Sequence, residues 1–300
     1  MRGLLAGEPL AAIIASGFFS SEPVQVALAV GAAVAIVSGA VGVFTVMRGQ
    51  SFAGEALADI GATGGSGAFL LGVGPLWGFV VMGIAAAAVM ELIGIQRPRG
   101  RDLATGIVLG AGLGLAALFL YLDATHHDTT GATVTILFGS VFAISSSTIP
   151  LVVALGTLAL GIVVALYRPL MLSTVNAEMA AARGVPVRVV GAGYLLALAI
   201  SVALAAVTIG AILSTALLVG PAAAALRLTK RPGRAMLAAG VIGMAATWLG
   251  VLLAYDSYYW PPKEHGWPVS FFVVTLIFIF YLVSGLPARW RGRSRCSRDS

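Results

Sequence analysis

The stretch VQVALAVGAAVAIVSGAVGVFTV, residues 24–46, contains no charged side chain and is almost entirely apolar. A helix needs about 20 apolar residues to cross the hydrocarbon core of a bilayer. The stretch is therefore long enough to span a membrane as one helix. Further segments of similar character follow it along the chain, so the sequence predicts a protein that crosses the membrane many times.

The composition of the whole chain indicates that lipid is the solvent for most of its surface. Of its 300 residues, 59% are hydrophobic and 10% are charged, and the mean hydropathy is +0.99. A soluble domain carries about 25% charged residues, so this chain has too few to cover a water-facing surface. The 38 glycines allow the close helix packing that is typical of membrane bundles. The net charge of +6 does not predict a nucleic-acid partner, because the basic residues are spread between apolar segments.

We expect an all-α membrane protein, a polytopic bundle of about eight or nine transmembrane helices. The predicted spans lie near residues 24–46, 52–71, 75–95, 103–122, 150–168, 188–206, 208–226, 235–254 and 269–286. The apolar segment 133–148 is shorter and ends in serines, which predicts a re-entrant or half helix that protein must bury. Residues 1–287 would form a single transmembrane domain, and residues 288–300 a basic tail.

The basic residues assign the two sides of the membrane, because cytoplasmic loops are enriched in Lys and Arg. With Arg48 on the cytoplasmic side, the predicted spans place all but Arg2 and Lys263 of the 18 Lys and Arg residues on that side. The outer loops then carry Glu8, Glu22, Asp123, Asp128, Asp256 and Glu264, together with His126, His127 and His265. We therefore expect a basic cytoplasmic face and an acidic outer face.

Glu55 and Asp59 are carboxylates within a predicted span, where a charged group is costly and marks a functional site by default. They are four residues apart, so they share one face of a helix. The two groups repel each other, and a passing divalent cation would relieve this repulsion through carboxylate oxygens. Alternatively, the helix dipole stabilises Glu55 near the start of its helix, and Asp59 pairs with an arginine. Glu91, near Arg97 and Arg99, is better explained as a structural interface pair.

Two other groups of residues have less specific interpretations. The outer histidines His126, His127 and His265 would form a metal-collecting site with neighbouring carboxylates, or would simply be solvated. In the inner loop RPLMLSTVNAEMAAARGVPVR, residues 168–188, Asn176 is a good helix cap. Gly184 would end the short helix that follows. Such a helix would dock into a groove of a cytoplasmic partner, or would serve as an ordinary connection.

The chain lacks a nucleotide-hydrolysing motif of its own. A phosphate-binding loop requires a lysine after a glycine, and the two lysines, Lys230 and Lys263, follow Thr229 and Pro262. ATP-driven transport would therefore need an ATPase on another chain.

Four segments of this sequence resemble the ABC-3 family of membrane permeases. FTVMRGQSFAGEALADIGATGG, residues 44–65, is similar to a stretch in which an Arg and Ser-Leu lead into Gly-Asp-Ala, then a His, then Leu-Pro-Gly. LFGSVFAIS (137–145) is similar to an outer Leu-Phe-Gly segment, and NAEMAAARG (176–184) to an Asp-x-Glu-x-Ala-x-x-x-Gly loop. IGAILSTALLVGPAAAA (209–225) is similar to a Val-Gly-x-Leu-Leu run that ends at Pro-Ala-Ala. The resemblance runs from about residue 24 to 286.

The resemblance implies roles for particular residues. Glu55 and Asp59 stand where the family has a metal-coordinating Asp and His, so the imidazole is replaced by a carboxylate. Thr63 stands at the usual Pro, whereas Gly64 matches. The loop with Asn176, Glu178, Ala180 and Gly184 matches the family's coupling helix, which contacts the ATPase. Asn176 replaces an Asp, a change that keeps the cap. An all-oxygen pair is a harder ligand set, which suits manganese better than zinc.

The resemblance further implies a permease subunit of an ATP-binding-cassette importer for zinc or manganese, in a bacterial inner membrane. It implies a homodimer with a pathway along its axis, two cytoplasmic ATPase chains that bind ATP, and an extracytoplasmic metal-binding protein. No cofactor would be bound permanently, and membrane lipid would surround the chain. Two alternatives remain open from the residues alone: a proton-coupled secondary metal transporter, and a non-transporting membrane scaffold.

Overall fold

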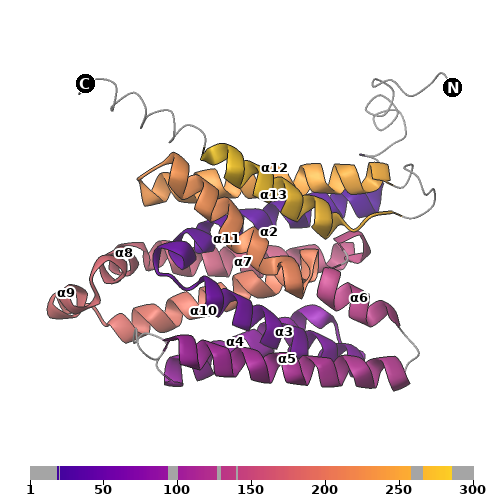
Figure 1. Cartoon of the computed structure of the whole chain (residues 1–300), viewed down its shortest axis with the longest axis horizontal. Helices are drawn as coiled ribbons and strands as arrows, with labels where there is room; N and C mark the ends of the chain where they lie inside the picture. Colours follow the sequence, from indigo (N-terminus) through magenta and orange to yellow (C-terminus); the bar gives the residue numbers. More distant parts are fainter. Residues whose placement is uncertain are drawn as a thin grey trace, which may run out of the picture.

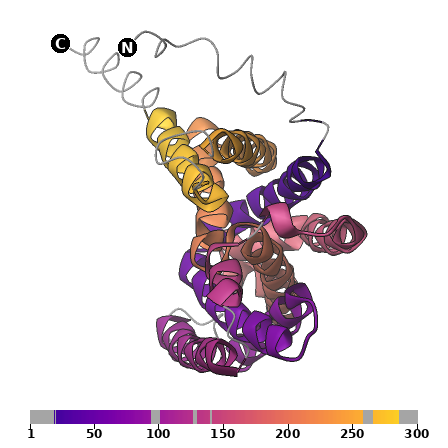
Figure 2. The same cartoon turned by 90° about the vertical axis from the view of Figure 1, so that its right-hand side faces the viewer.

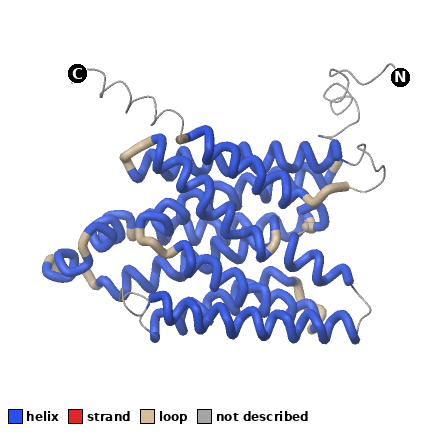
Figure 3. The backbone as a smooth tube through the Cα atoms, viewed as in Figure 1, coloured by secondary structure: helices blue, strands red, loops and turns tan. Residues whose placement is uncertain are grey.

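The computed structural model describes residues 19, 21–93, 101–126, 130–139, 141–257 and 266–285. These residues form helices joined by turns and short loops, without a β-strand among them (Figure 3). The helices are α2 (Glu22–Met47), α3 (Ser51–Leu70), α4 (Pro75–Ile93), α5 (Arg101–His126), α6 (Thr130–Phe138), α7 (Ile149–Ala165), α8 (Tyr167–Val175), α9 (Ala177–Ala182), α10 (Val187–Ile209), α11 (Ala211–Leu228), α12 (Pro232–Ser257) and α13 (Val269–Ser284), with two 3₁₀ turns, η2 (Val141–Ala143) and η3 (Ser146–Thr148). The predicted all-α membrane fold is confirmed.

The long helices run side by side between two ends of the bundle (Figures 1 and 2). We call these the α9 end, at the left of Figure 1, and the α6 end, at its right. The turn with Arg48 between α2 and α3 lies at the α9 end, as does the turn with Lys230 between α11 and α12. The turn between α3 and α4 lies at the α6 end. The described basic turns therefore gather at one end, as the predicted sidedness requires.

Seven described segments are long and apolar enough to cross a membrane. They are α2, α4, residues 105–125 of α5, residues 146–165 with α7, α10, α11 and α12. Two more helices coincide with predicted spans but are not among the seven. In α3, two carboxylates and many glycines lower the hydropathy. In α13, 16 residues extend only about 24 Å, so the crossing of α3 and α13 stays a prediction.

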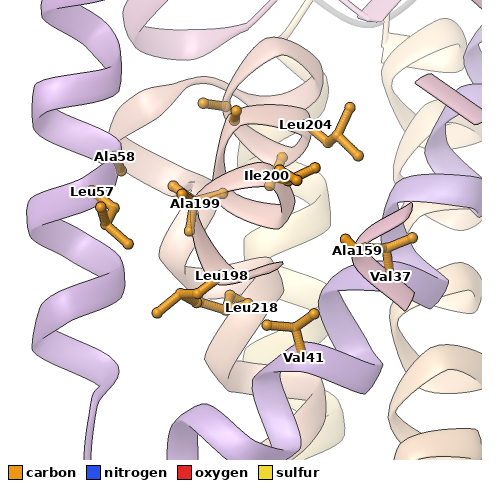
Figure 4. Packing of buried hydrophobic residues seen from close by; sticks show 14 of the residues in the cluster. Val37, Val41, Leu57, Ala58, Ala159, Leu198, Ala199, Ile200, Leu204 and Leu218 are labelled. Atoms are coloured by element: carbon orange, nitrogen blue, oxygen red, sulfur yellow. The ribbon is translucent and has the colours of Figure 1, made fainter. Parts of the chain in front are cut away.

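The core of the bundle is centred on α2 and α10. Most residues of these two helices are buried, whereas most of α5 and α7 face outward. Figure 4 shows Leu57 and Ala58 of α3 facing α10, where Ala199 and Ile200 lie, while Leu218 of α11 completes this part of the core. The helix that bears both intramembrane carboxylates is therefore anchored to the centre of the bundle by its apolar side.

Glycines let several helices approach until their backbones touch. A Cβ atom on Gly42 of α2 would lie 1.9 Å from the carbonyl oxygen of Leu218, and one on Gly39 would lie 2.6 Å from the amide nitrogen of Gly240 in α12. Between α3 and α4, a Cβ atom on Gly64 would lie 2.1 Å from the carbonyl oxygen of Gly78. Small residues in this chain thus serve close packing, as expected in a bilayer.

The segment predicted as a half helix, 133–148, covers most of α6, which begins at Thr130, and the two 3₁₀ turns. The nine residues of α6 extend about 13 Å, too short to cross a membrane. The helix ends at Phe138, and the next residue, Gly139, has a φ of +76°, which favours glycine. Gly139 packs directly on Gly210 between α10 and α11, where φ is +92°. A Cβ atom on either glycine would overlap backbone atoms of the other segment. The half helix is therefore fixed to the break between two core helices.

Candidate metal centre

Glu55 and Asp59 both lie in the half of α3 that is nearer the α9 end, and both are half-buried. Their spacing of four residues puts them on one face of the helix. Because α3 begins at Ser51, Glu55 lies beyond the first turn, which contains no acidic residue. The helix dipole acts mainly within the first turn, so it gives little reason for a carboxylate at this position.

Two sides of α3 are held against neighbouring helices. Gly64, nine residues after Glu55 and so about half a turn away from it, packs on Gly78 of α4. Thr63, four residues after Asp59, lies nearer the side of the carboxylates. Its Oγ1 atom donates a hydrogen bond of 2.8 Å to the carbonyl oxygen of Gly112 in α5. These contacts fix the rotation of α3 about its axis, and so they fix the direction in which the carboxylates face.

Neither carboxylate has a hydrogen bond or an ion pair within the described part of the chain. The charge of Glu55 repels that of Asp59. Arg48, the basic residue closest in sequence, donates instead to Ser173 and Thr174 of α8. A pair of repelling carboxylates on a packed helix is a site that a cation would stabilise.

The pair by itself does not complete a coordination shell. Among the described residues, no group of three or more His, Cys, Asp or Glu side chains could hold a metal ion. Carboxylates bind in one- or two-oxygen modes, and Mn, Mg and Ca ions take six or more oxygen ligands. Water or another chain would have to supply the remaining ligands.

The predicted outer metal-collecting site falls largely outside the described residues. His126 is the last residue of α5, while His127 and His265 lie beyond the described ranges. Asp123, predicted in the outer loop, belongs instead to α5, which continues to His126, and its side chain is 1% exposed. The continuation of the helix past the predicted end at residue 122 removes this carboxylate from the loop.

The predicted docking helix is α9, at the far end of the bundle in Figure 1. Asn176 caps it, because its Oδ1 atom accepts a hydrogen bond of 2.8 Å from the Met179 amide. Gly184, with φ of +76°, lies where the chain turns away toward α10. Asn176, Glu178 and Gly184 are exposed, whereas Ala180 is fully buried. Of the four predicted coupling residues, three are thus available to a partner and Ala180 anchors α9 to the protein.

The helix that precedes α9, α8, was not predicted from the sequence. The predicted span ended at residue 168, and the residues after it were expected to form a loop. Pro169 near the start of α8 is a signal of a helix start, and Leu170 is one of the buried residues through which α8 packs. The contact of Arg48 with α8 was not predicted either, although the structure shows it.

Comparisons with known proteins give the same assignment as the four segments. The model of the ABC 3 transport family matches residues 20–284. The chain is 29% identical to the manganese transport system membrane protein MntC of Listeria innocua, over 77% of this chain and 81% of that protein. It is 30% identical to MntC of Halalkalibacterium halodurans, over 77% of this chain and 79% of that protein.

Solved structures have the same fold. PsaBC from Streptococcus pneumoniae in complex with Fab matches with a TM-score of 0.77 and 25% identity, covering 92% of this chain and 95% of that chain. An inward-facing putative metal-chelate type ABC transporter matches with a TM-score of 0.72 at 16% identity, over 95% and 91% of the two chains, and shows the fold alone. Because the family model spans nearly all of the described residues, this multi-pass protein of the bacterial plasma membrane belongs to the ABC 3 transport family.

Proposed function

We propose that the chain is the membrane-spanning permease subunit of an ATP-binding-cassette importer for divalent metal ions, and that manganese is its preferred ion. The observation that carries the proposal is the pair Glu55 and Asp59, two carboxylates on one face of a packed helix with no cationic partner in the described residues. The family assignment and the names of the relatives, which are manganese transport proteins, support the same ion class.

The chemistry of the pair favours manganese over zinc. Zinc is held most strongly by nitrogen and sulfur ligands in a tetrahedral set, and the described residues supply neither His nor Cys beside Glu55 and Asp59. Oxygen ligands suit manganese, which accepts carboxylates and water in an octahedral shell. In a homodimer with the pathway along its axis, a second copy would bring an equal pair, and water would complete the shell.

The energy for transport would come from separate ATPase chains. The sequence carries no phosphate-binding loop, and α9 presents an exposed, capped helix at the end where the described basic turns gather. We propose that each ATPase chain holds α9, and that an extracytoplasmic metal-binding protein delivers the ion to the opposite end. The carboxylate pair would then hold the ion transiently while access alternates between the two sides.

The proposal is tested by ⁵⁴Mn²⁺ uptake into cells that express the complete system with Glu55→Gln, Asp59→Asn or both substitutions. Each single substitution removes one charge from the pair, and we expect uptake to fall by about tenfold or more, which corresponds to about 1.4 kcal/mol of lost ion stabilisation. The matched control is Glu22→Gln, which removes an exposed carboxylate in the first turn of α2 and should leave uptake unchanged.

Two results would contradict the proposal. Uptake at the wild-type rate by the double variant, with normal expression, would show that Glu55 and Asp59 do not bind the ion on its path. Uptake by this chain alone in vesicles with a proton gradient and no ATPase would indicate a secondary transporter instead.

A further inference from the structure

The side chain of Arg48 joins three segments at the α9 end. Arg48 directly follows α2, and its Nη1 atom donates to Ser173 Oγ at 3.1 Å and to Thr174 Oγ1 at 3.5 Å, both in α8. Its guanidinium carbon lies 5.4 Å from the ring centroid of Tyr194 in α10. The half-buried guanidinium thus lies between the segment that leads to α3 and the segment that leads to α9.

The partners of Arg48 are themselves fixed. Tyr194 is fully buried, and its hydroxyl lies 2.6 Å from Thr45 Oγ1 in the last turn of α2. Thr45 donates its own proton to the carbonyl oxygen of Val41 at 3.1 Å, so Tyr194 is the donor to Thr45. Phe44 adds an edge-on contact with Tyr167 of α8, with ring centroids 5.8 Å apart. The end of α2 therefore contacts both α8 and α10 and holds them together.

No flexible linker separates the contacts of Arg48 with α8 from α9. Asn176 is at once the residue that ends α8 and the residue that caps α9. Ser173 and Thr174, the acceptors of Arg48, lie within the last turn of α8. A displacement of α9 by a bound partner would therefore act on the Arg48 contacts almost directly.

The connection from Arg48 to α3 is equally short. Only Gly49 and Gln50 separate it from the start of α3, and the Gln50 amide donates to the carbonyl oxygen of Thr45 at 2.9 Å. Gln50 is 3% exposed, so this turn is packed against the protein. Movement of the guanidinium would pull on the turn that begins α3, and Glu55 lies in the second turn of that helix.

We infer that Arg48 is the positioning residue that transmits displacement of α9 to the carboxylate helix α3. The inference rests on the proposed function, because it assumes that an ATPase chain moves α9. An arginine that merely marks the membrane interface would be replaceable by lysine. Arg48 uses a planar guanidinium both to donate to two hydroxyls and to stack on an aromatic ring, which lysine cannot reproduce.

The test uses the permease assembled with its partner ATPase and metal-binding protein in proteoliposomes, with Mn²⁺ as the transported probe. The measured quantity is the number of Mn²⁺ ions transported per ATP hydrolysed. For Arg48→Gln and Arg48→Lys we expect this ratio to fall by about tenfold, within the range of measured coupling effects. The ATPase rate without Mn²⁺ should stay within about twofold of wild type, since the hydrolytic site lies on another chain.

A matched control comes from the same end of the bundle. Arg227 of α11 stacks on Tyr281 of α13, with its guanidinium carbon 3.7 Å from the ring centroid, and also hydrogen-bonds to Tyr281. Within the described part of the chain these contacts join α11 to α13 and not to α3 or α8, so Arg227→Gln should leave the ratio unchanged. The double variant Ser173→Ala with Thr174→Val removes the acceptors without altering Arg48, and it should reproduce the loss.

The outcomes separate the two proposals. If the wild-type complex does not transport Mn²⁺ under ATP, the proposed function itself fails. If the wild type transports but the Arg48 and Ser173/Thr174 variants keep the wild-type ratio, or if Arg227→Gln lowers the ratio equally, the inference about Arg48 is wrong. Should Arg48→Gln fail to assemble, the Ser173/Thr174 variant decides alone.

Discussion

At the scale of single residues, the contact between Gly64 and Gly78 decides where α3 lies. A Cβ atom on Gly64 would meet the Gly78 carbonyl oxygen at 2.1 Å and the Met82 side chain at 2.5 Å. We expect Gly64→Ala to lower the free energy of unfolding by about 1–3 kcal/mol, because the clash is with backbone that cannot turn aside. Thermal unfolding of the purified protein in detergent, followed by the loss of monodisperse protein, measures this change.

Gly114 of α5 is the matched control for Gly64. It also lies inside a helix, but a Cβ atom there would meet nothing within 4 Å, so Gly114→Ala should not lower the unfolding temperature. If both variants unfold at the same temperature as wild type, the helices are further apart than the structure places them.

The residues of the candidate site were predicted from the sequence because charge inside a membrane is conspicuous. Glu55 and Asp59 interrupt an apolar pattern and stand four apart, so both their shared face and their functional interest could be predicted. The contacts of Arg48 could not. An arginine at a membrane boundary has an ordinary explanation in the positive-inside rule, and its contact with Ser173 joins residues 125 positions apart, which no local pattern records.

At the scale of the element, α9 depends on one side chain for its first turn. It has six residues, far fewer than an isolated helix needs to be stable, and Asn176 satisfies the Met179 amide that would otherwise lack a partner within the helix. We expect Asn176→Ala to cost about 1 kcal/mol of helix stability, and so to weaken binding of the ATPase about fivefold. Titration of the ATPase onto the permease in nanodiscs, by biolayer interferometry, measures the affinity.

Asn176→Asp is the control for the cap, because an aspartate accepts the same backbone hydrogen bond. It should bind the ATPase as tightly as the wild type. Equal affinity for the alanine and aspartate variants would show that the order of α9 does not limit docking.

The elements differ in how far the sequence could define them. The existence of α9 followed from a capping residue and a terminating glycine, both of which are local signals. The burial of Ala180 was not foreseeable, because alanine suits an exposed helix as well as a buried one. The extension of α5 to His126 was not predicted either, because a charged residue such as Asp123 at the end of an apolar segment favours a loop. Only the fold shows that Asp123 is buried by the protein.

At the scale of the whole molecule, composition and apolar segments were enough to predict the all-α membrane bundle. They could not predict the packing order, in which α2 and α10 are central while α5 and α7 are peripheral. All of these helices are apolar around their whole circumference in the sequence, so hydrophobicity does not distinguish a lipid-facing side from a protein-facing one. Glycine positions carry that information, but which glycine meets which helix emerges only from the fold.

The sidedness of the bundle is a property of the whole molecule and can be tested directly with cysteines. Cys296 is the only cysteine in the chain, so Cys296→Ser provides a background without cysteine. On this background, Gly74→Cys places a cysteine in the α3–α4 turn and Lys230→Cys places one in the α11–α12 turn. Both positions are exposed, and the two turns lie at opposite ends of the bundle. Because basic loops remain in the cytoplasm, we expect a membrane-impermeant maleimide to label intact spheroplasts at Gly74→Cys and not at Lys230→Cys. Inside-out vesicles should give the reverse, and detergent-solubilised protein should label at both positions. Labelling of Lys230→Cys from outside would show that the protein has the opposite orientation in the membrane. In that orientation, α9 would face away from any cytoplasmic ATPase.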